Sequence, residues 1–293
     1  MTAALRIQRP LEPGRGSIVA GMALCALLTA FTTGPAAAQD WLGASDLRGT
    51  FSSMFGGSPS YWNGFYFGGD YGHTSMKADF NNAVSGEIAY ILRNTTVEDE
   101  FAPSNWTALP NKSVTGSSYG AFFGYNWQND GLVLGFGLTY NHLSGTKAAA
   151  SDAIARIVTT SDGYKHDLSI YGSSSVHLKD YATIRARAGY PIGRFLPYAF
   201  VGAAVGRFSY SSSATVIDDI TPPSDPEYIV GPITETDGKG TAYEIGFASG
   251  LGVDVQLVPN VFLRGEWEYV AFAPLDHIKT YMNSFKGGVG VRF

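Results

Sequence analysis

The carboxy-terminal segment of the chain, residues 281–293, alternates between two kinds of side chain. One face carries Phe285, Val289, Val291 and Phe293, and the residues between them are polar, charged or glycine. Successive side chains of a β-strand point to opposite faces, so the segment predicts a strand with one apolar and one polar face. Such a strand fits a closed barrel that crosses a bilayer, because the barrel turns apolar side chains towards lipid and polar ones towards its lumen.

Helical membrane spans are excluded for the chain after residue 38. A helix needs about 20 apolar residues to cross a bilayer, and the longest apolar run, residues 195–206, is shorter than this and contains Pro197. Lipid offers the backbone no hydrogen-bond partners, so helices and closed barrels are the only spanning structures. The mean hydropathy near zero agrees with a barrel, because half of each strand faces a polar lumen.

The amino-terminus predicts export. Three arginines precede an apolar run at residues 18–31, and three alanines at residues 36–38 follow it, which is the pattern of a cleaved signal peptide over residues 1–38. We expect residues 39–61 to form a periplasmic lead-in and residues 62–293 to form the barrel, in the outer membrane. Cys25, the single cysteine, lies within the signal peptide, so the mature chain has no thiol chemistry. The formal net charge of -5 argues against nucleic acid as a partner.

Alternation recurs in eight segments, residues 62–73, 119–127, 132–141, 176–190, 195–208, 243–255, 261–269 and 281–293. The links after the second, fourth and sixth segments are short, whereas those after the first, third and fifth are long (residues 74–116, 143–174 and 209–241). Short turns at the periplasmic rim and long loops at the extracellular rim are typical of outer-membrane barrels. The sequence therefore predicts an all-β fold, an eight-stranded antiparallel up-and-down transmembrane β-barrel with long extracellular loops. A ten-stranded barrel, with a further pair within residues 85–97 and 166–172, remains an alternative.

Aromatic residues gather where the strands leave the hydrocarbon, as they do at membrane interfaces. We expect one girdle at the short-turn rim and another at the long-loop rim, formed respectively by Trp62, Trp127, Tyr190, Tyr198 and Phe293, and by Tyr71, Tyr140, Tyr243, Tyr269 and Tyr281. Glycines at alternate positions, such as Gly250 and Gly252, are expected to make room in the lumen for large neighbours.

The positions that face the lumen carry charges of both signs. They comprise five cations, Arg185, Arg187, Arg264, Lys286 and Arg292, and four anions, Glu244, Asp254, Glu266 and Glu268. The interior of an eight-stranded barrel is only wide enough to be filled by side chains. Leaving a charge there unpaired costs several kcal/mol, so the near balance predicts a salt-bridged plug.

A family resemblance rests on several short segments taken in order. These are Trp62-Asn-Gly-Phe-Tyr-Phe-Gly-Gly, Gly124-Tyr-Asn-Trp-Gln, Ile184-Arg-Ala-Arg-Ala-Gly-Tyr with Leu196-Pro-Tyr, Glu266-Trp-Glu-Tyr and the terminal Val-Arg-Phe. Over residues 62–293 the chain resembles the small outer-membrane β-barrel family of alphaproteobacteria, which includes the outer membrane immunogenic proteins and is related to the OmpA-type barrel. The resemblance implies insertion by the outer-membrane assembly machinery, and we expect Phe285, Val289, Val291 and Phe293 to act as its assembly signal. It implies no catalytic residue and no cofactor.

Catalytic and metal sites have weak support. Ser118 lies in a Gly-x-Ser-x-Gly pattern, but a strand follows it where a nucleophile elbow needs a helix. The five histidines, His73, His142, His166, His177 and His277, lack metal-ligand spacing. We therefore expect no catalytic, cofactor or metal site.

The expected protein is a monomer whose partners are outer-membrane lipid and lipopolysaccharide and, through its loops, a host or surface ligand. Its expected role is membrane integrity, adhesion or host contact. One alternative is a small-solute channel like a porin. A second is a lipid A-modifying enzyme, which would need a histidine and a serine or carboxylate to meet at the level of the outer leaflet.

Overall fold

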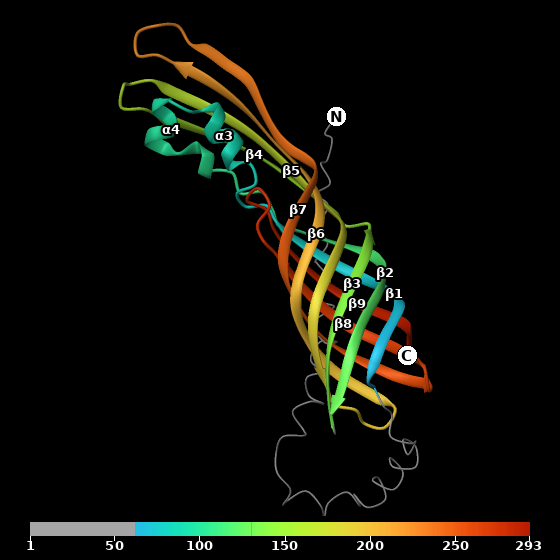
Figure 1. Ribbon diagram of the computed structural model, residues 1–293. Coiled ribbons are helices and arrows are strands. Elements are labelled where there is room, and N and C mark those ends of the chain that lie inside the picture. The colour runs from blue at the N-terminus through green and yellow to red at the C-terminus, as the bar shows by residue number, and fades with distance from the viewer. Residues whose placement is uncertain (1–61, 130) are drawn as a thin grey trace, which may run out of the picture. The chain divides into compact units, whose positions relative to one another are not determined.

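The computed structural model describes residues 62–129 and 131–293, so the predicted signal peptide and lead-in lie outside the described residues. Nine strands dominate this part of the chain (Figure 1). They are β1 (Gly64–Asp79), β2 (Lys112–Asn129), β3 (Leu132–Ser144), β4 (Lys147–Thr159), β5 (Lys165–Gly189), β6 (Phe195–Thr221), β7 (Tyr228–Val258), β8 (Val261–Phe272) and β9 (Lys279–Arg292). Two helices, α3 (Ser85–Ile91) and α4 (Thr96–Phe101), and the 3₁₀ turn η1 (Pro103–Asn105) lie between β1 and β2. Neither helix is long or apolar enough to cross a membrane.

Eight of the strands close into a ring. Antiparallel pairing runs from β3 through β2, β1, β9, β8, β7 and β6 to β5, and β5 then pairs with β3. β4 stands outside the ring and pairs with the first half of β5, beyond the point where β3 ends. The predicted eight-stranded antiparallel up-and-down barrel is confirmed. The ten-stranded alternative is wrong, because residues 85–91 are helical and residues 166–172 belong to β5.

The predicted alternation holds along the ring. On β3 the predicted outward residues Leu132, Leu134, Phe136, Leu138 and Tyr140 are all exposed, and the residues between them are buried. Two of the expected girdle residues are exceptions, since Trp62 is 1% exposed and Tyr198 is 5% exposed. Both point into the lumen because Trp62 has the inward-facing parity of β1, which it precedes, and Tyr198 has that of β6. Residue type alone therefore does not identify a girdle residue. Expected room for large neighbours is confirmed at Gly252, where an added Cβ would lie 2.4 Å from the ring of Tyr198.

The long connections are folded rather than irregular. Residues 143–174, expected as one loop, contain β4 and the first part of β5, and residues 209–241 contain the ends of β6 and β7. We call the resulting structure the extension: residues 80–111, β4, and residues 165–178, 209–221 and 228–242. In Figure 1, α3 and α4 lie against the strands of this region. The sequence concealed it because alternation beyond the membrane is indistinguishable from alternation within it.

A β-bulge marks the passage of β5 from the extension into the ring. The register against β6 shifts between Leu178 and Asp180. In the ring, after the bulge, the odd-numbered residues of β5 are buried, such as Tyr181 and Arg185. In the extension, before the bulge, the even-numbered residues are buried, such as Val176 and Leu178. An extra residue in one strand shifts the side on which the following residues lie. Asp180 consequently points outward.

Candidate functional site

The ring is filled by a cluster of ion pairs that crosses the lumen. The Arg185 guanidinium lies 2.6 Å from Glu266 Oε1. Lys286 Nζ lies 2.7 Å from Glu268 Oε2 and 3.4 Å from Glu266 Oε1. These side chains are at most 2% exposed. The two glutamates therefore share their charge between two cations, and Glu266 links them into one network.

Asp254 is the centre of a second group of pairs. Its carboxylate accepts two hydrogen bonds from Arg264, at 2.8 and 2.9 Å, and one from Arg187 at 3.0 Å. Two-pronged arginine–carboxylate contacts are among the strongest hydrogen bonds that proteins form. Arg187 also donates to the Asn126 side chain at 2.9 Å, which ties this group to β2.

Aromatic rings fill the space around the ions. The Arg264 guanidinium lies 4.1 Å from the ring centre of Phe122, and that of Arg187 lies 4.3 Å from the ring centre of Tyr66. Tyrosine hydroxyls donate further hydrogen bonds to the carboxylates, from Tyr198 to Glu266 and from Tyr181 to Glu268, each at 2.8 Å. Charges in a confined space are stabilised by such contacts.

Seven of the nine predicted lumen charges lie in these pairs, namely Arg185, Arg187, Asp254, Arg264, Glu266, Glu268 and Lys286. Arg292 does not join them, because it lies half-buried at the short-turn rim, where it donates to the Pro259 carbonyl at 2.7 Å and covers the Trp62 ring. Glu244 is half-buried higher in the ring, opposite Gly206, and among the described residues it forms no ion pair.

Asp70 is the lumen charge that sequence reasoning missed. It shares the inward parity of Tyr66 on β1, and this signal was present in the alternation. The paired residues comprise four cations and three anions. A fourth carboxylate at Asp70 balances the formal charge of the interior.

The residues of the predicted assembly signal lie along β9 and its end. Phe285, Val289 and Phe293 are exposed on the outer face, whereas Val291 is half-buried. The ring of Phe293 stacks on that of Phe67, with 5.7 Å between centroids, and its backbone N–H donates to Phe65 at 2.9 Å. The last residue is thus fastened to the first strand of the ring.

A hydrophobic core fills the extension and continues into the adjoining end of the ring, where it includes Met76, Phe208 and Met282. Ile88 and Val84 at α3, and Leu109 before β2, are fully buried, and they pack with Ile170 of β5. The contact is close at Gly172, where an added Cβ would lie 3.0 Å from Val84. The helices therefore cover one face of the sheet formed by β4, β5, β6 and β7.

Polar contacts anchor the far end of this cover. The Glu100 carboxylate of α4 accepts two hydrogen bonds from the Ser161 backbone N–H, at 3.0 and 3.2 Å, and one from its hydroxyl. The Arg156 guanidinium of β4 lies 4.9 Å from the ring centre of Trp106. These contacts join α4 and η1 to β4 and to the turn that follows it.

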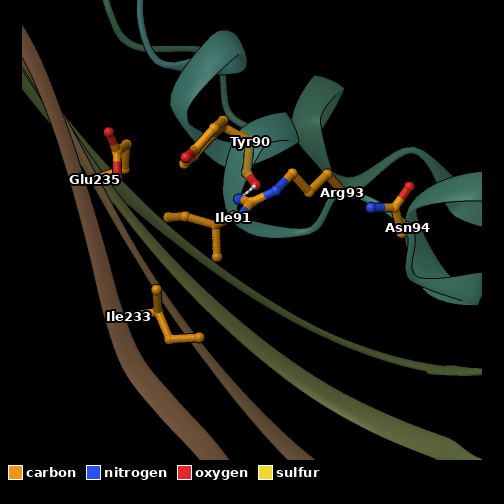
Figure 2. Close-up of a pocket in the computed structure, with 6 residues that line it drawn as sticks. All are labelled: Tyr90, Ile91, Arg93, Asn94, Ile233 and Glu235. Atoms are coloured by element: carbon orange, nitrogen blue, oxygen red, sulfur yellow. Dashed lines mark hydrogen bonds between the residues drawn. The ribbon is translucent and has the colours of Figure 1, made fainter.

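A shallow pocket opens where α3 meets β7 (Figure 2). Its volume is about 430 Å³, and it is lined by Tyr90, Ile91, Arg93, Asn94, Ile233 and Glu235. Arg93 lies over the Tyr90 ring and donates to the Tyr90 carbonyl at 2.5 Å. Figure 2 shows Glu235 and Ile233 on the strand facing these helix residues. The pocket presents one aromatic ring and charges of both signs to solvent.

Three carboxyl groups, two in the extension and one between β8 and β9, have raised pKa values. Burial, reinforced by Asp276 and Asp237, raises the pKa of Glu87, which is 7% exposed. Burial and the charge of Asp237 also raise the pKa of Asp276. Burial raises the pKa of Asp218 although His166 contacts it at 2.7 Å. Burial thus favours the protonated form of each of these carboxyl groups, compared with the same group in water.

Two of the five histidines pair with carboxylates. His166 pairs with Asp218 across β5 and β6, and His142 Nδ1 lies 2.6 Å from Asp180 Oδ1. Both pairs join different strands, so sequence spacing could not reveal them. Within the described residues no group of histidine, cysteine and acidic side chains has the arrangement of a metal site.

Ser118 lies within β2, and the chain continues as a strand beyond Gly120 as predicted. Its hydroxyl is buried and makes no hydrogen bond with any described residue. The strand–turn–helix geometry of a nucleophile elbow is therefore missing at Ser118.

Comparison with known proteins agrees with this architecture. The family described as "Outer membrane protein beta-barrel domain" matches residues 23–293. No curated protein sequence matches the chain significantly. Among solved structures, Neisserial surface protein A is 16% identical, with 78% of this chain and 97% of that chain covered and a TM-score of 0.34. Ail, the attachment invasion locus protein of Yersinia pestis, is also 16% identical, with 79% and 99% covered and a TM-score of 0.34. OprG from Pseudomonas aeruginosa is 13% identical, with 79% and 96% covered and a TM-score of 0.34.

Proposed function

Because the chain belongs to the outer membrane protein β-barrel domain family, we propose that it is a closed outer-membrane barrel whose work is done by the extension at the cell surface. Outer-membrane barrels keep short turns on the periplasmic side and long segments outside. The extension is therefore extracellular. Its role is adhesion or host contact, and its ligand is a surface molecule of the host or of a neighbouring cell.

The observation that carries this proposal is the packed core of the extension. Ile88 and Val84 are fully buried between α3 and the sheet, so this segment has a fixed surface rather than a fluctuating one. A rigid surface loses less conformational entropy when it binds a partner.

The channel alternative is less well supported by the lumen. The ion pairs of Glu266 and Asp254 cross the interior, and their side chains are at most 1% exposed. An eight-stranded ring leaves room for side chains and no more. We infer a plugged barrel that does not pass solutes.

The enzyme alternative has one specific observation in its favour. His142 and Asp180 meet on the outer wall of the ring, as a histidine–carboxylate pair would. However, no serine or threonine hydroxyl of the described residues hydrogen-bonds to His142, and general-base catalysis at a hydroxyl nucleophile needs that contact. We therefore infer a protein without catalytic activity. Lipid A from cells that produce the protein should have an unchanged mass spectrum, and the same should hold for cells producing Ser118→Ala.

The finer assignment and the remaining residues follow from the same reasoning. We infer that the chain is a barrel of the alphaproteobacterial group, because its short motifs occur in the order of that group. We also infer that it is a monomer. We further infer that residues 1–38 are a signal peptide and residues 39–61 a periplasmic lead-in. The last strand is read by the assembly machinery through Phe285, Val289, Val291 and Phe293.

An adhesion assay tests the proposed role. Cells displaying the wild-type protein should adhere to host epithelial cells more than cells without it, and Ile88→Asp should abolish the gain because a buried charge separates α3 from the sheet. Ile192→Asp, at an exposed position in the turn between β5 and β6, is the matched control and should adhere like wild type. Equal adhesion with and without the intact extension, together with steady conductance of the purified protein in a planar bilayer, would favour the channel instead.

A further inference from the structure

A charged cluster lies on the outer wall of the ring, where lipid is expected. Asp180, whose side chain is 6% exposed, accepts a hydrogen bond from His142 Nδ1 at 2.6 Å and another from the Tyr140 hydroxyl at 3.0 Å. Its other oxygen accepts two hydrogen bonds from Arg207, one of them from Nε at 2.6 Å. Register places His142, Asp180 and Arg207 side by side on β3, β5 and β6.

The depth of this cluster is set by its neighbours. Charged side chains on the lipid face of a barrel cost roughly 2–4 kcal/mol at the middle of the bilayer and little near its surface. Tyr119, Tyr140 and Tyr243 surround the cluster, and tyrosines concentrate at the level of lipid headgroups. The cluster lies towards the extension, so, resting on the proposed extracellular position of the extension, it lies at the outer leaflet.

An apolar groove adjoins the charges. Its volume is about 350 Å³, and its lining includes Tyr140 and Tyr243 on the sides with Ala182 and Val205 between them. Tyr140 pairs with Ala182, and Ala182 pairs with Val205, so the small side chains form a floor one row away from Asp180 and Arg207. An apolar groove with a cation at one end matches an acyl chain attached to an anionic headgroup.

Donors at the head of the groove remain available. Arg207, whose side chain is 42% exposed, uses Nε and one terminal nitrogen on Asp180, and no described residue accepts from its other terminal nitrogen. His142 binds Asp180 through Nδ1, and no described residue hydrogen-bonds to its Nε2. Asp180 thus holds the Arg207 guanidinium on one side of its carboxylate and the His142 imidazole, which is cationic when protonated, on the other. These contacts keep both side chains at the wall of the ring rather than extended into solvent.

We propose that this cluster and groove form a binding site for the phosphorylated, acylated lipid A anchor of lipopolysaccharide. A phosphate oxygen accepts from the free terminal nitrogen of Arg207, and His142 adds a second donor when it is protonated. One acyl chain lies over Ala182 and Val205 between the two tyrosines. The site is separate from the surface role of the extension, since it faces the membrane.

Native mass spectrometry of the refolded protein in detergent micelles tests the site, with monophosphoryl lipid A and its dephosphorylated form as probes. The wild type should retain the phosphorylated probe preferentially. Loss of one charge-assisted hydrogen bond weakens binding by roughly ten- to a hundredfold, so Arg207→Gln should show that loss. Arg194→Gln, at the opposite rim, should bind like wild type.

A second variant guards against misfolding of the cluster. Ala182→Leu fills the groove and leaves Asp180 and its partners unchanged, so it should lower retention of the phosphorylated probe. Ala186→Leu, on the outer face of the same strand, is its control. Equal retention of the two probes by wild type, or unchanged retention by both Arg207→Gln and Ala182→Leu, would overturn the proposal.

Discussion

The part of the ring that holds the ion pairs and the extension fill their interiors by opposite means. The ring buries Arg185, Arg187, Arg264 and Lys286 with their carboxylates, whereas the core of the extension is built from Ile88, Val84, Leu168, Ile170 and other apolar side chains. The surroundings explain the difference. The ring stands in lipid and offers its apolar residues to the outside, so polar residues are left for the lumen. The extension, in its proposed position outside the membrane, stands in water and must bury its apolar residues to remain folded.

The comparison implies different responses to the loss of one residue. Removing one partner from a buried ion pair leaves an uncompensated charge and costs about 3–5 kcal/mol. Removing apolar atoms costs about 2–5 kcal/mol, in proportion to the cavity that remains. The first kind of loss also changes the charge of the lumen, and the second does not.

The largest effect is expected for Glu266→Ala combined with Glu268→Ala. Arg185 and Lys286 would lose their carboxylates, so the barrel should unfold at a lower temperature and should pass anions in preference to cations. Conductance in a planar bilayer and heat-dependent gel mobility measure the two effects. The matched control is Asp225→Ala with Glu227→Ala, exposed residues before β7. Steady nanosiemens-scale conductance of the wild type, changed in selectivity but not in stability by the double variant, would contradict the plugged ring.

Variants of Phe293 test whether folding of the ring depends on the contact between its last residue and β1. Deleting Phe293, or replacing it with Asp, removes the stacking on Phe67 and the expected end of the assembly signal. Folded, protease-resistant protein in the outer membrane should fall well below the wild-type level. Tyr228→Asp, at an exposed position of the extension, should leave that level unchanged. Undiminished insertion of the Phe293 variants would show that the closing strand is sufficiently specified elsewhere.

A change of intermediate size is expected for Ile88→Ala. The cavity beneath α3 should destabilise the cover of the extension by about 2–5 kcal/mol. Hydrogen exchange of α3 should accelerate, while amides of the ring should exchange as in the wild type. Ile157→Ala, at an exposed position on β4, should change neither. Faster exchange throughout the ring would show that the two interiors fold as one unit.

The smallest effect concerns pH. Burial raises the pKa of Glu87, so the folded extension holds this proton more tightly than the unfolded chain does. The resulting stabilisation is complete below the ordinary carboxyl pKa and is lost as the pH rises through the raised value. The protection factors of the α3 amides, which correct for the intrinsic pH dependence of exchange, should therefore be higher at mildly acidic pH than at pH 7. Glu87→Gln should reduce this dependence, with Glu227→Gln as the exposed control.

The sequence predicted the ring well and the extension poorly, for a physical reason. Alternation identifies a strand, and in a membrane the apolar face identifies the outside, so the ion pairs of Arg185 and Glu266 could be expected from parity alone. The alternation does not report how far along the barrel axis an inward-facing residue lies. Parity therefore predicts Arg292 and Glu244 among the pairs, although Arg292 lies at the short-turn rim and Glu244 lies nearer the extension.

The extension was missed because its signals depend on the partner strand. Residues 166–178 do alternate, with Leu168, Ile170 and Val176 on one face. The sequence of this segment does not show that helices from another part of the chain bury that face, so the segment resembles an exposed loop. β4 is rich in alanine and small polar residues and has little pattern of its own. The His142–Asp180 pair depends on the bulge in β5, which sequence alternation does not show.

That bulge limits how the length of β5 can change. The even-numbered residues above it face the cover and the odd-numbered residues below it face the lumen, so both interiors depend on one additional residue near Lys179. Loss of Lys179 alone would turn Leu178, Val176 and Ile170 towards water, whereas loss of two residues would shorten the strand and keep every remaining side chain on its side. Insertions and deletions compatible with folding in this part of β5 must therefore change its length by an even number of residues. Only such changes keep every side chain of the strand on its present face.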